Sequence, residues 1–325
     1  MFRKLLKQLK FIVIIVVIII CIPRSIFPNS TQSGDIEYYI NLNDAEVRLP
    51  EFKDSREALE LKLEQLDLIN RSRRRFGAKP VKLDILASRV ANKICREAAM
   101  NEYIGHWNLA GEKPYLRYAF AGGYDHVSEN AYAEWSKENL ENAPDEIAFL
   151  MKNGHETFME ERAPNDGHKQ TVIAKDHNFV GLGYCLTGKQ FRYYEEFIDR
   201  YLEFEKIPTE VKPGKRTTIT VKVPEKTFLY FMIVYYEKFP EPLTPKDISR
   251  RSSYDDFTKD QYQQVYAWNL ATYRNGNSYS IPLSFKKEGL YYIQIFSDKK
   301  EYIKETSLST RGKTPYSGIV ISVRN

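Results

Sequence analysis

The chain has 325 residues, enough for about two domains. Hydrophobic residues make up 42% and aromatic residues 14%, which is enough apolar material for real cores and excludes a largely disordered chain. The 48 Lys and Arg residues exceed the 43 Asp and Glu residues by only 5, so the charge gives no reason to expect nucleic acid as a partner. Three cysteines are too few for a disulfide-held scaffold.

The first 27 residues predict an export signal. Basic residues precede an uncharged apolar run from Phe11 to Ile22, and Pro23 ends that run. The run covers about 18 Å, which is shorter than a hydrocarbon core of about 30 Å. Because no small-residue cleavage site follows, we interpret residues 1–27 as an uncleaved signal anchor, with a cleaved signal peptide as the alternative. The rest of the chain is expected outside the cytoplasm, either membrane-anchored or secreted.

Residues 28–54 lack a sustained period and predict an irregular stalk or linker. Asn29 lies in this segment and matches the acceptor pattern for N-glycosylation. A glycan is expected there if the host is a eukaryote.

Residues 55–205 predict a domain of helices and strands. Apolar residues at helical spacing indicate a helix that begins at the Asp54-Ser55 cap and ends near Arg75. Asp84 is expected to cap a second helix, and a third is expected over Pro144–Asn153, closed by Gly154. Two strands are predicted to follow, over Phe179–Cys185 and Gln190–Phe197.

The composition changes after residue 206, where β-branched and aromatic residues alternate with turn signals. Short strands at this spacing predict a β-sandwich over residues 206–325. The segment Lys238–Asn275 is too long for a hairpin loop and is expected to have structure of its own. The predicted strands are Thr217–Val223, Phe228–Tyr236, Ser278–Phe285, Leu290–Phe296 and Gly318–Val323.

Two of the five histidines occur in informative settings. His106 follows the second predicted helix, and His168 precedes the glycine-rich strand. Glu129 lies between them in the sequence. His126 and His177 fall in polar segments and are expected on the surface.

Four segments, in order, resemble the CAP superfamily of cysteine-rich secretory proteins, also called SCP domains. Gly105-His106 resembles the block that holds the family's first histidine, and Ser128-Glu129-Asn130 resembles its Gly-Glu-Asn signature with Ser in place of Gly. The opening and closing blocks are resembled by Asn70–Arg73 with Pro80–Asp84, and by Gly167-His168 with Phe179–Tyr184. The resemblance covers about residues 59–203. It implies a CAP-type α-β-α sandwich, here followed by the β-sandwich.

This resemblance also implies one cleft lined by two histidines and two acids that can hold a divalent ion. His106, Glu129 and His168 carry over to this role. The fourth group, an acid, is expected on or after the third helix, where the candidates are Glu156, Glu160 and Glu161.

The residue types by themselves allow two interpretations of this set. Imidazoles and a carboxylate, with one position left to water, make a zinc-type site. The same groups can instead hydrogen-bond to one another and tie helices to a sheet. His155-Glu156 does not make a zinc-protease motif, because position 159 is Met rather than His.

We therefore expect a protein that binds rather than turns over its ligand. The resemblance to the CAP superfamily implies a ligand that is a small or lipidic molecule, a divalent cation such as zinc, or both. One alternative is a zinc-dependent hydrolase in which His106 and His168 bind zinc and Glu129 is a ligand or general base. The other is a structural or docking protein whose C-terminal β-domain binds a protein partner.

Two further features of the first domain have open alternatives. Cys95 and Cys185 can form a disulfide in an oxidising compartment. The basic residues Arg71 and Arg73–Arg75 are interpreted as the end of a helix, where cations offset the helix dipole. Binding of nucleic acid or acidic lipid is the alternative for the basic run.

Overall fold

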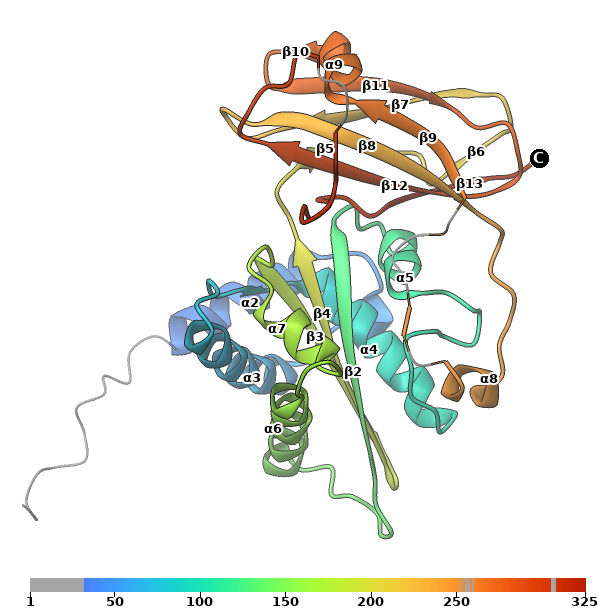
Figure 1. The fold of residues 1–325 in the computed structure, drawn as a ribbon. Helices are drawn as coiled ribbons and strands as arrows, with labels where there is room; N and C mark the ends of the chain where they lie inside the picture. Colours follow the sequence, from blue (N-terminus) through green and yellow to red (C-terminus); the bar gives the residue numbers. More distant parts are fainter. Residues whose placement is uncertain (1–31, 252, 255–257, 259, 305–307) are drawn as a thin grey trace, which may run out of the picture. The chain divides into compact units, whose positions relative to one another are not determined.

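The computed structural model describes residues 32–251, 253–254, 258, 260–304 and 308–325. The fold is α+β, as predicted: a helix-flanked sheet is followed by two further sheets (Figure 1). Residues Tyr39–Asn325 form one compact unit. The predicted signal anchor and Asn29 lie outside the described residues. Among the helices that are described, none has both the length and the apolar character needed to cross a membrane.

Side-chain caps start the first two predicted helices, as expected. The Ser55 hydroxyl accepts a hydrogen bond from the Ala58 amide (3.1 Å), and the Asp84 carboxylate accepts one from the Ala87 amide (2.7 Å). The helices up to residue 173 are α2 (Gln32–Ala45), η1 (Pro50–Phe52), α3 (Arg56–Arg75), α4 (Ile85–Met100), α5 (Pro114–Phe120), α6 (Pro144–Glu160) and α7 (Gly167–Ile173).

The first sheet has helices on both faces, which gives the α-β-α layering. Tyr194 packs on one face in a cluster with residues of α4, and Tyr193 lies on the other face, where Gln65 of α3 donates to its hydroxyl (3.0 Å). Neighbouring residues of one strand therefore serve opposite layers, as the strand period of about two requires. The strands, in the order β1-β3-β4-β2, are β1 (Lys82–Leu83), β3 (Phe179–Thr187), β4 (Gln190–Asp199) and β2 (His126–Trp135).

Two glycines let α4 lie directly on β3. A Cβ atom on Gly181 would come within 2.3 Å of the Ala87 carbonyl carbon, and one on Gly183 within 2.3 Å of the Ala91 carbonyl carbon. Because the atoms in the way belong to helix backbone, no side-chain rotation can make room. The glycine-rich strand pattern therefore sets the helix–sheet distance.

The structure corrects the predicted end of the third helix. Instead of ending before Gly154, α6 continues through it to Glu160. A Cβ on Gly154 would lie 2.9 Å from ring carbons of both Tyr132 and Tyr193. The glycine therefore permits close packing of the helix on the sheet and does not end the helix.

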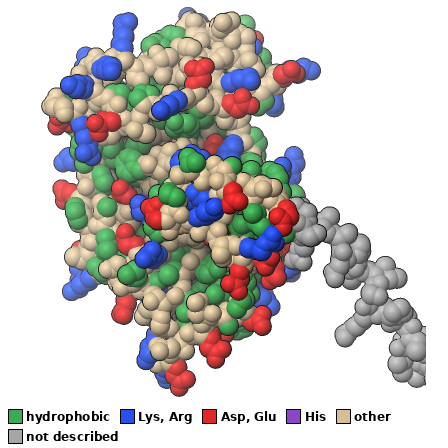
Figure 2. Space-filling view, turned by 180° about the vertical axis from the view of Figure 1, so that it is seen from behind, with side chains coloured by type: hydrophobic (Ala, Val, Ile, Leu, Met, Phe, Trp, Pro, Cys, Tyr) green, Lys and Arg blue, Asp and Glu red, His purple; other side chains and the backbone are tan. Residues whose placement is uncertain are grey.

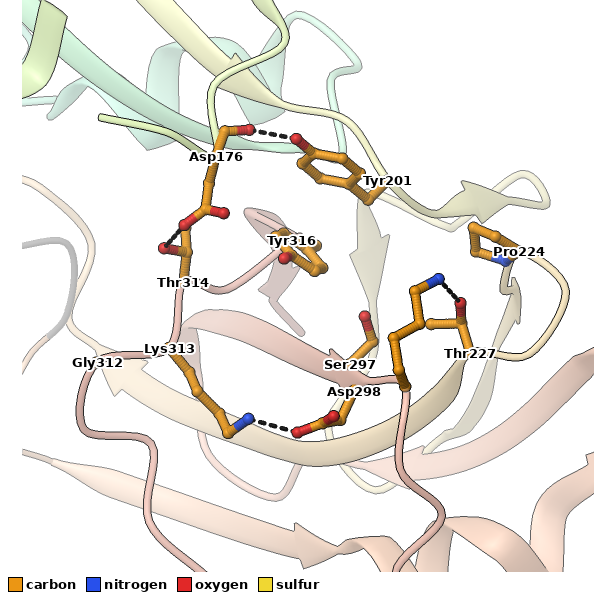
Figure 3. Close-up of a pocket in the computed structure, with 11 residues that line it drawn as sticks. Asp176, Tyr201, Pro224, Thr227, Ser297, Asp298, Gly312, Lys313, Thr314 and Tyr316 are labelled. Carbon is orange, nitrogen blue, oxygen red and sulfur yellow. Dashed lines mark hydrogen bonds and ion pairs between the residues drawn. The ribbon is translucent and has the colours of Figure 1, made fainter. Parts of the chain in front are cut away.

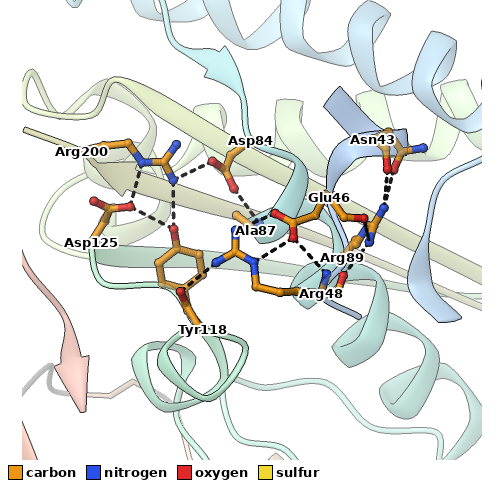
Figure 4. A network of polar contacts seen from close by, with 10 residues as sticks. Asn43, Glu46, Arg48, Asp84, Ala87, Arg89, Tyr118, Asp125 and Arg200 are labelled. Atoms are coloured by element: carbon orange, nitrogen blue, oxygen red, sulfur yellow. Dashed lines mark hydrogen bonds and ion pairs between the residues drawn. The ribbon is translucent and has the colours of Figure 1, made fainter. Parts of the chain in front are cut away.

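The structure also corrects the prediction of an irregular stalk over residues 28–54. The described part of that segment forms α2 and η1. The Arg89 guanidinium of α4 donates to the backbone carbonyls of Asn43 (2.6 Å), Glu46 (2.9 Å) and Arg48 (2.6 Å), as Figure 4 shows in part. Because the acceptors are backbone carbonyls, the pattern of side chains in the sequence does not predict these contacts.

Two sheets form the predicted β-sandwich around one apolar core. Ile219 and Ile281 contribute to that core from one sheet, and Val234 and Ile293 from the other. The first sheet, in the order β10-β11-β7-β5, has β10 (Arg274–Asn275), β11 (Ser278–Ser284), β7 (Arg216–Lys222) and β5 (Glu203–Phe204). The second, in the order β6-β13-β12-β8-β9, has β6 (Glu210–Val211), β13 (Ile319–Val323), β12 (Gly289–Asp298), β8 (Phe228–Glu237) and β9 (Gln261–Tyr266).

The second sheet of the sandwich is buried on its other face as well. Phe231 and Tyr292 belong to an apolar cluster with Leu86 of α4 and Tyr115 of α5. The rings of Tyr115 and Tyr292 stack with their centroids 4.3 Å apart. Burial on both faces explains the continuous apolar run of β8, since such a strand has no solvent side.

The segment Lys238–Asn275 has structure of its own, as expected, in the part that is described. Besides β9 and β10 it contains α8 (Pro245–Ser249), α9 (Ala267–Leu270) and η2 (Ala271–Tyr273). Its first part lies along the loop that follows α4. The Leu243 amide donates to the Leu109 carbonyl (2.8 Å), and Ile248 packs so closely on Gly105 that a Cβ there would lie 2.7 Å from its Cγ2.

Candidate functional site

His106 and Glu129 form the first half of the candidate site. His106 lies in the loop after α4, and its Nδ1 atom is 2.8 Å from Oε1 of Glu129 in β2. Both residues are buried, with 9% of His106 and 4% of Glu129 exposed. Because a strand holds the carboxylate in place, the imidazole has one defined orientation.

Arg117 of α5 lies between two buried carboxyl groups. It donates to Oε2 of Glu129 and lies 3.5 Å from Oε1 of Glu196. Glu196 of β4 is the cross-strand neighbour of Glu129. Burial, together with the charge of Glu129, raises the pKa of Glu196 well above its usual range. Arg117 thus lies within reach of both carboxyl groups and hydrogen-bonds to Glu129.

The protonation state of His106 follows from the same surroundings. Burial and the positive charge of Arg117 lower the pKa of His106 to about 4. The ring is therefore neutral near pH 7, and its Nδ1–H group donates to Glu129. This tautomer leaves Nε2 as a hydrogen-bond acceptor.

His168 and Glu161 form the second half of the site. The His168 Nδ1 atom lies 2.5 Å from Glu161 Oε1, and the His168 amide donates to Glu161 Oε2 (2.9 Å). Of the three acids considered for the fourth position, Glu161 is therefore the one hydrogen-bonded to His168, whereas Glu156 and Glu160 are exposed on α6. The side chain of His168 is 35% exposed, so this half of the site faces solvent.

The fold places the two halves next to each other. The ring centroids of His106 and His168 are 6.4 Å apart. Phe158 of α6 stacks on His168 at 4.9 Å, and the ring of Tyr254 lies 4.8 Å from His106. The Tyr254 hydroxyl also accepts a hydrogen bond from the Glu129 amide (3.1 Å). The pair of imidazoles is thus flanked by two aromatic rings.

Sequence reasoning missed Arg117, Glu196 and Tyr254. Arg117 lies in a segment where the sequence shows no motif. Tyr254 belongs to the segment Lys238–Asn275, which is far along the chain from both histidines. Glu196 could be found only from the pairing of the strands. Once β2 and β4 are aligned, Glu129 and Glu196 lie directly opposite each other.

In the described part of the chain, the candidate donor groups are not gathered around one metal position. Among the described residues, no group of three or more His, Cys, Asp or Glu side chains is placed to hold a metal. Glu129 is paired with Arg117. Nδ1 of each histidine is bound to a carboxylate, which leaves Nε2 as the ring nitrogen able to bind a metal. The zinc site therefore stays a prediction from the resemblance, one that requires Glu129 to leave its arginine.

A second buried hydrogen-bond chain joins α3, α6 and β4. The Ser72 hydroxyl lies 2.9 Å from Nε2 of His155, and Nδ1 of His155 lies 2.8 Å from Glu195 Oε1. The order of groups resembles that of a serine nucleophile, its base and an orienting acid. Ser72 lies inside α3, however, where the neighbouring amides are bonded within the helix and cannot form an oxyanion hole. We interpret this chain as a structural tie.

The structure corrects the prediction that His126 and His177 are surface residues. Each is only 5% exposed. Their Nδ1 atoms lie 2.8 Å and 2.7 Å from the two carboxylate oxygens of Asp199, at the end of β4. Their polar neighbours in the sequence suggested exposure. Both rings are buried because each can hydrogen-bond to the carboxylate of Asp199, which lies on a distant strand.

The cysteines lie in one apolar cluster and are both free. Cys95 of α4 is buried there, and Cys185 of β3 packs against it half-buried. Burial raises the pKa of both thiols. Their oxidation to a disulfide stays a prediction.

The basic residues at the end of α3 differ in burial, and they do not form one solvent-exposed face. Arg73 is fully buried and donates to the backbone carbonyls of Lys79 (2.8 Å) and His177 (3.0 Å). It satisfies loop carbonyls and so holds the connection before β3. On the face shown in Figure 2, basic and acidic side chains are interspersed and do not gather by sign.

Taken together, the chain is an α+β protein with a helix-flanked sheet and a β-sandwich packed against it. Its two neighbouring imidazoles, buried His106 and partly exposed His168, are each oriented by a carboxylate. No protein-family model matches the chain, and no curated protein matches it.

Several solved structures are similar over part of the chain. One is an extracellular protein with an SCP domain from Bacillus anthracis: the match covers 42% of this chain and 40% of that one, at 19% identity and a TM-score of 0.33. Another is an outer surface protein from Borrelia burgdorferi, with 43% and 93% covered, 15% identity and a TM-score of 0.35. A superoxide reductase from Ignicoccus hospitalis matches at 14% identity, with 38% and 81% covered and a TM-score of 0.21. The chain thus spans less than half the length of the Bacillus protein.

Proposed function

We propose that this chain is an extracytoplasmic, CAP-type binding protein that holds a small or lipidic ligand at the His106–His168 pair without turning it over. The observation that carries the proposal is the pair itself. Two imidazoles from separate segments lie with centroids 6.4 Å apart, and a carboxylate orients each through Nδ1. The CAP assignment rests on the four ordered motifs, and the location rests on the N-terminal signal pattern.

The surroundings of the pair suggest the chemistry of the ligand. Nε2 of neutral His106 is an acceptor, so it suits a group that donates a hydrogen bond. Phe158 and Tyr254 add apolar ring surface on either side. A hydroxyl or amide group on an apolar body meets both conditions, which is why a lipidic or small amphipathic ligand is proposed.

A zinc-dependent hydrolase is less well supported. It needs Glu129 as a metal ligand or as a base for a bound water. In the structure Arg117 engages that carboxylate. No bond-breaking step is therefore assigned to these residues.

Native mass spectrometry of the full chain, gently purified from an export host, tests the proposal. We expect an added small-molecule mass that survives a chelator and is lost in His106→Ala and His168→Ala. Gln170→Ala, an exposed change on α7 near His168, should keep the added mass. A bare chain, or an adduct retained in both histidine variants, would contradict ligand binding at this pair. Chelator-sensitive metal that disappears in His106→Ala would support the hydrolase instead.

A further inference from the structure

A second site lies away from the histidines, where the helix-flanked sheet meets the β-sandwich. It is a pocket of about 400 Å³, shown in Figure 3. That volume is in the range of about 300–1,000 Å³ found for small-molecule sites, which favour boundaries between structural layers. Asp176 and Tyr201 line it from the first part of the chain, whereas its other lining residues come from the sandwich strands and their loops.

Two tyrosine rings form one wall of this pocket. Tyr201 and Tyr316 have centroids 4.6 Å apart and planes inclined by 46°. Tyr201 is 36% exposed, so part of its ring is open to an incoming molecule. The Tyr201 hydroxyl donates to the Asp176 carbonyl (2.6 Å), which fixes the ring. Burial raises the pKa of Tyr316 to about 12, so its hydroxyl stays protonated and able to donate.

The opposite side of the pocket is polar but electrically balanced. Lys313 and Asp298 form an ion pair of 2.5 Å, and the Lys299 ammonium donates to the Thr227 hydroxyl (2.7 Å). Figure 3 shows the Lys313–Asp298 pair on the side of the pocket opposite Tyr201. Asp176 adds a second carboxylate and receives the Thr314 hydroxyl at 2.6 Å. The two lysines and two aspartates cancel in charge, so the pocket attracts neither a strong anion nor a strong cation.

An apolar ring wall facing a balanced set of donors and acceptors fits one class of ligand best. A saccharide presents C–H faces that pack on aromatic rings and hydroxyl groups that both donate and accept hydrogen bonds. We propose that this pocket binds a short, uncharged saccharide, with its ring against Tyr201 and Tyr316 and its hydroxyls on Asp298, Lys313 and Lys299. This site is separate from the His106–His168 pair, and the proposal does not depend on the function proposed for that pair.

Saturation-transfer NMR and calorimetry on the full chain test the proposal. The probes are cellobiose, maltose, mannobiose and chitobiose, with glycine and inorganic phosphate as zwitterionic and anionic comparisons. We expect at least one disaccharide to bind, with signals strongest on its ring protons. Tyr201→Ala should weaken binding by about tenfold, the equivalent of about 1.4 kcal/mol. Tyr273→Ala removes a tyrosine of similar exposure (38%) that does not line the pocket, and it should leave binding unchanged.

Two further variants keep the test independent of folding and of the histidine site. Tyr316→Phe retains the ring and removes only the hydroxyl, so it should weaken binding while preserving the thermal unfolding midpoint. His168→Ala should leave saccharide binding unchanged. The proposal is overturned if none of the four disaccharides binds, if only glycine or phosphate binds, or if Tyr201→Ala binds as well as Tyr273→Ala.

Discussion

Glu161 holds His168 at two points: one carboxylate oxygen lies 2.5 Å from the ring nitrogen Nδ1, and the other accepts the backbone amide at 2.9 Å. Ring and backbone of His168 are thus fixed by one acid that directly follows α6. This contact distinguishes Glu161 from its neighbour Glu160, which is exposed.

Glu161→Gln should release the ring of His168. A neutral amide accepts the Nδ1–H hydrogen bond less strongly than a carboxylate. We therefore expect the population of the Nδ1–H tautomer to fall, as read from long-range ¹⁵N–¹H spectra of protein labelled at histidine. Glu160→Gln is the matched control and should leave the His168 signals unchanged. Equal effects of the two changes would contradict the assignment of Glu161.

His106 should make stability fall on mild acidification. Its pKa is about 4 in the folded chain and 6.5 as an ordinary histidine, so the unfolded chain takes up the proton first. Its contribution is complete above pH 6.5 and decreases towards pH 4, by about 3 kcal/mol at most. Urea unfolding at pH 7 and pH 4.5 should show a smaller loss for His106→Gln than for wild type. An identical loss would indicate that His106 titrates normally.

Asp199 should affect the stability of the fold in a lower pH range than His106 does. Burial favours its protonated form, but hydrogen bonds from His126 and His177 prevail and lower its pKa to about 2, from 3.8. The stabilisation is present above pH 3.8 and is lost as the pH falls towards 2, and it amounts to about 2 kcal/mol.

Asp199→Asn is the variant that tests this contribution. It should be less stable than wild type at pH 7 and should lose less further stability between pH 4 and pH 2. Asp67→Asn, an exposed change on α3, should follow wild type throughout. The prediction fails if Asp199→Asn and Asp67→Asn have the same free energy of unfolding at pH 7.

Gly181→Ala should be strongly destabilising. Its new methyl group would meet helix backbone at 2.3 Å, so α4 must move away from β3. We expect a loss of about 3 kcal/mol or more in the free energy of unfolding, measured in urea. Gly167→Ala adds the same methyl group where nothing lies within 4 Å, and should change stability by less than about 0.5 kcal/mol. A small effect at both positions would mean that α4 and β3 are not in such close contact.

The sequence allows a disulfide between Cys95 and Cys185, whereas the structure, in which both thiols are free, favours reduced cysteines in the folded chain. Burial raises the pKa of both thiols, which keeps them in the less reactive protonated form. Alkylation in denaturant without reductant, followed by intact mass analysis, should modify all three cysteines of the chain. Modification of Cys21 alone would establish the Cys95–Cys185 disulfide instead.

The sequence predicted the features that depend on neighbours along the chain. Ser55 and Asp84 start their helices because an N-cap needs only a side-chain oxygen and an amide three residues on. The five predicted strands of the sandwich appear at their expected places because alternation and turn residues act locally. The ordered motifs also selected His106, Glu129 and His168, which the fold brings close to one another.

The local sequence pattern gave wrong predictions where a residue distant in the chain determines the structure. Gly154 has the form of a helix stop, yet Tyr132 and Tyr193 require a glycine in mid-helix at that point. His126 and His177 have polar neighbours, yet Asp199 takes both rings into the interior.

By itself, then, the sequence determined the α+β class, the order of its two parts and the main members of the histidine site. These follow from periodicity, capping and motif order, which are properties of short segments. Only the tertiary structure decided the choice of Glu161, the pairing of Arg117 with Glu129, the approach of Tyr254 and the pocket between Tyr201 and Lys313. Each of those joins groups far apart in the chain, and burial and charge act through space, so their partners are set by how the layers pack.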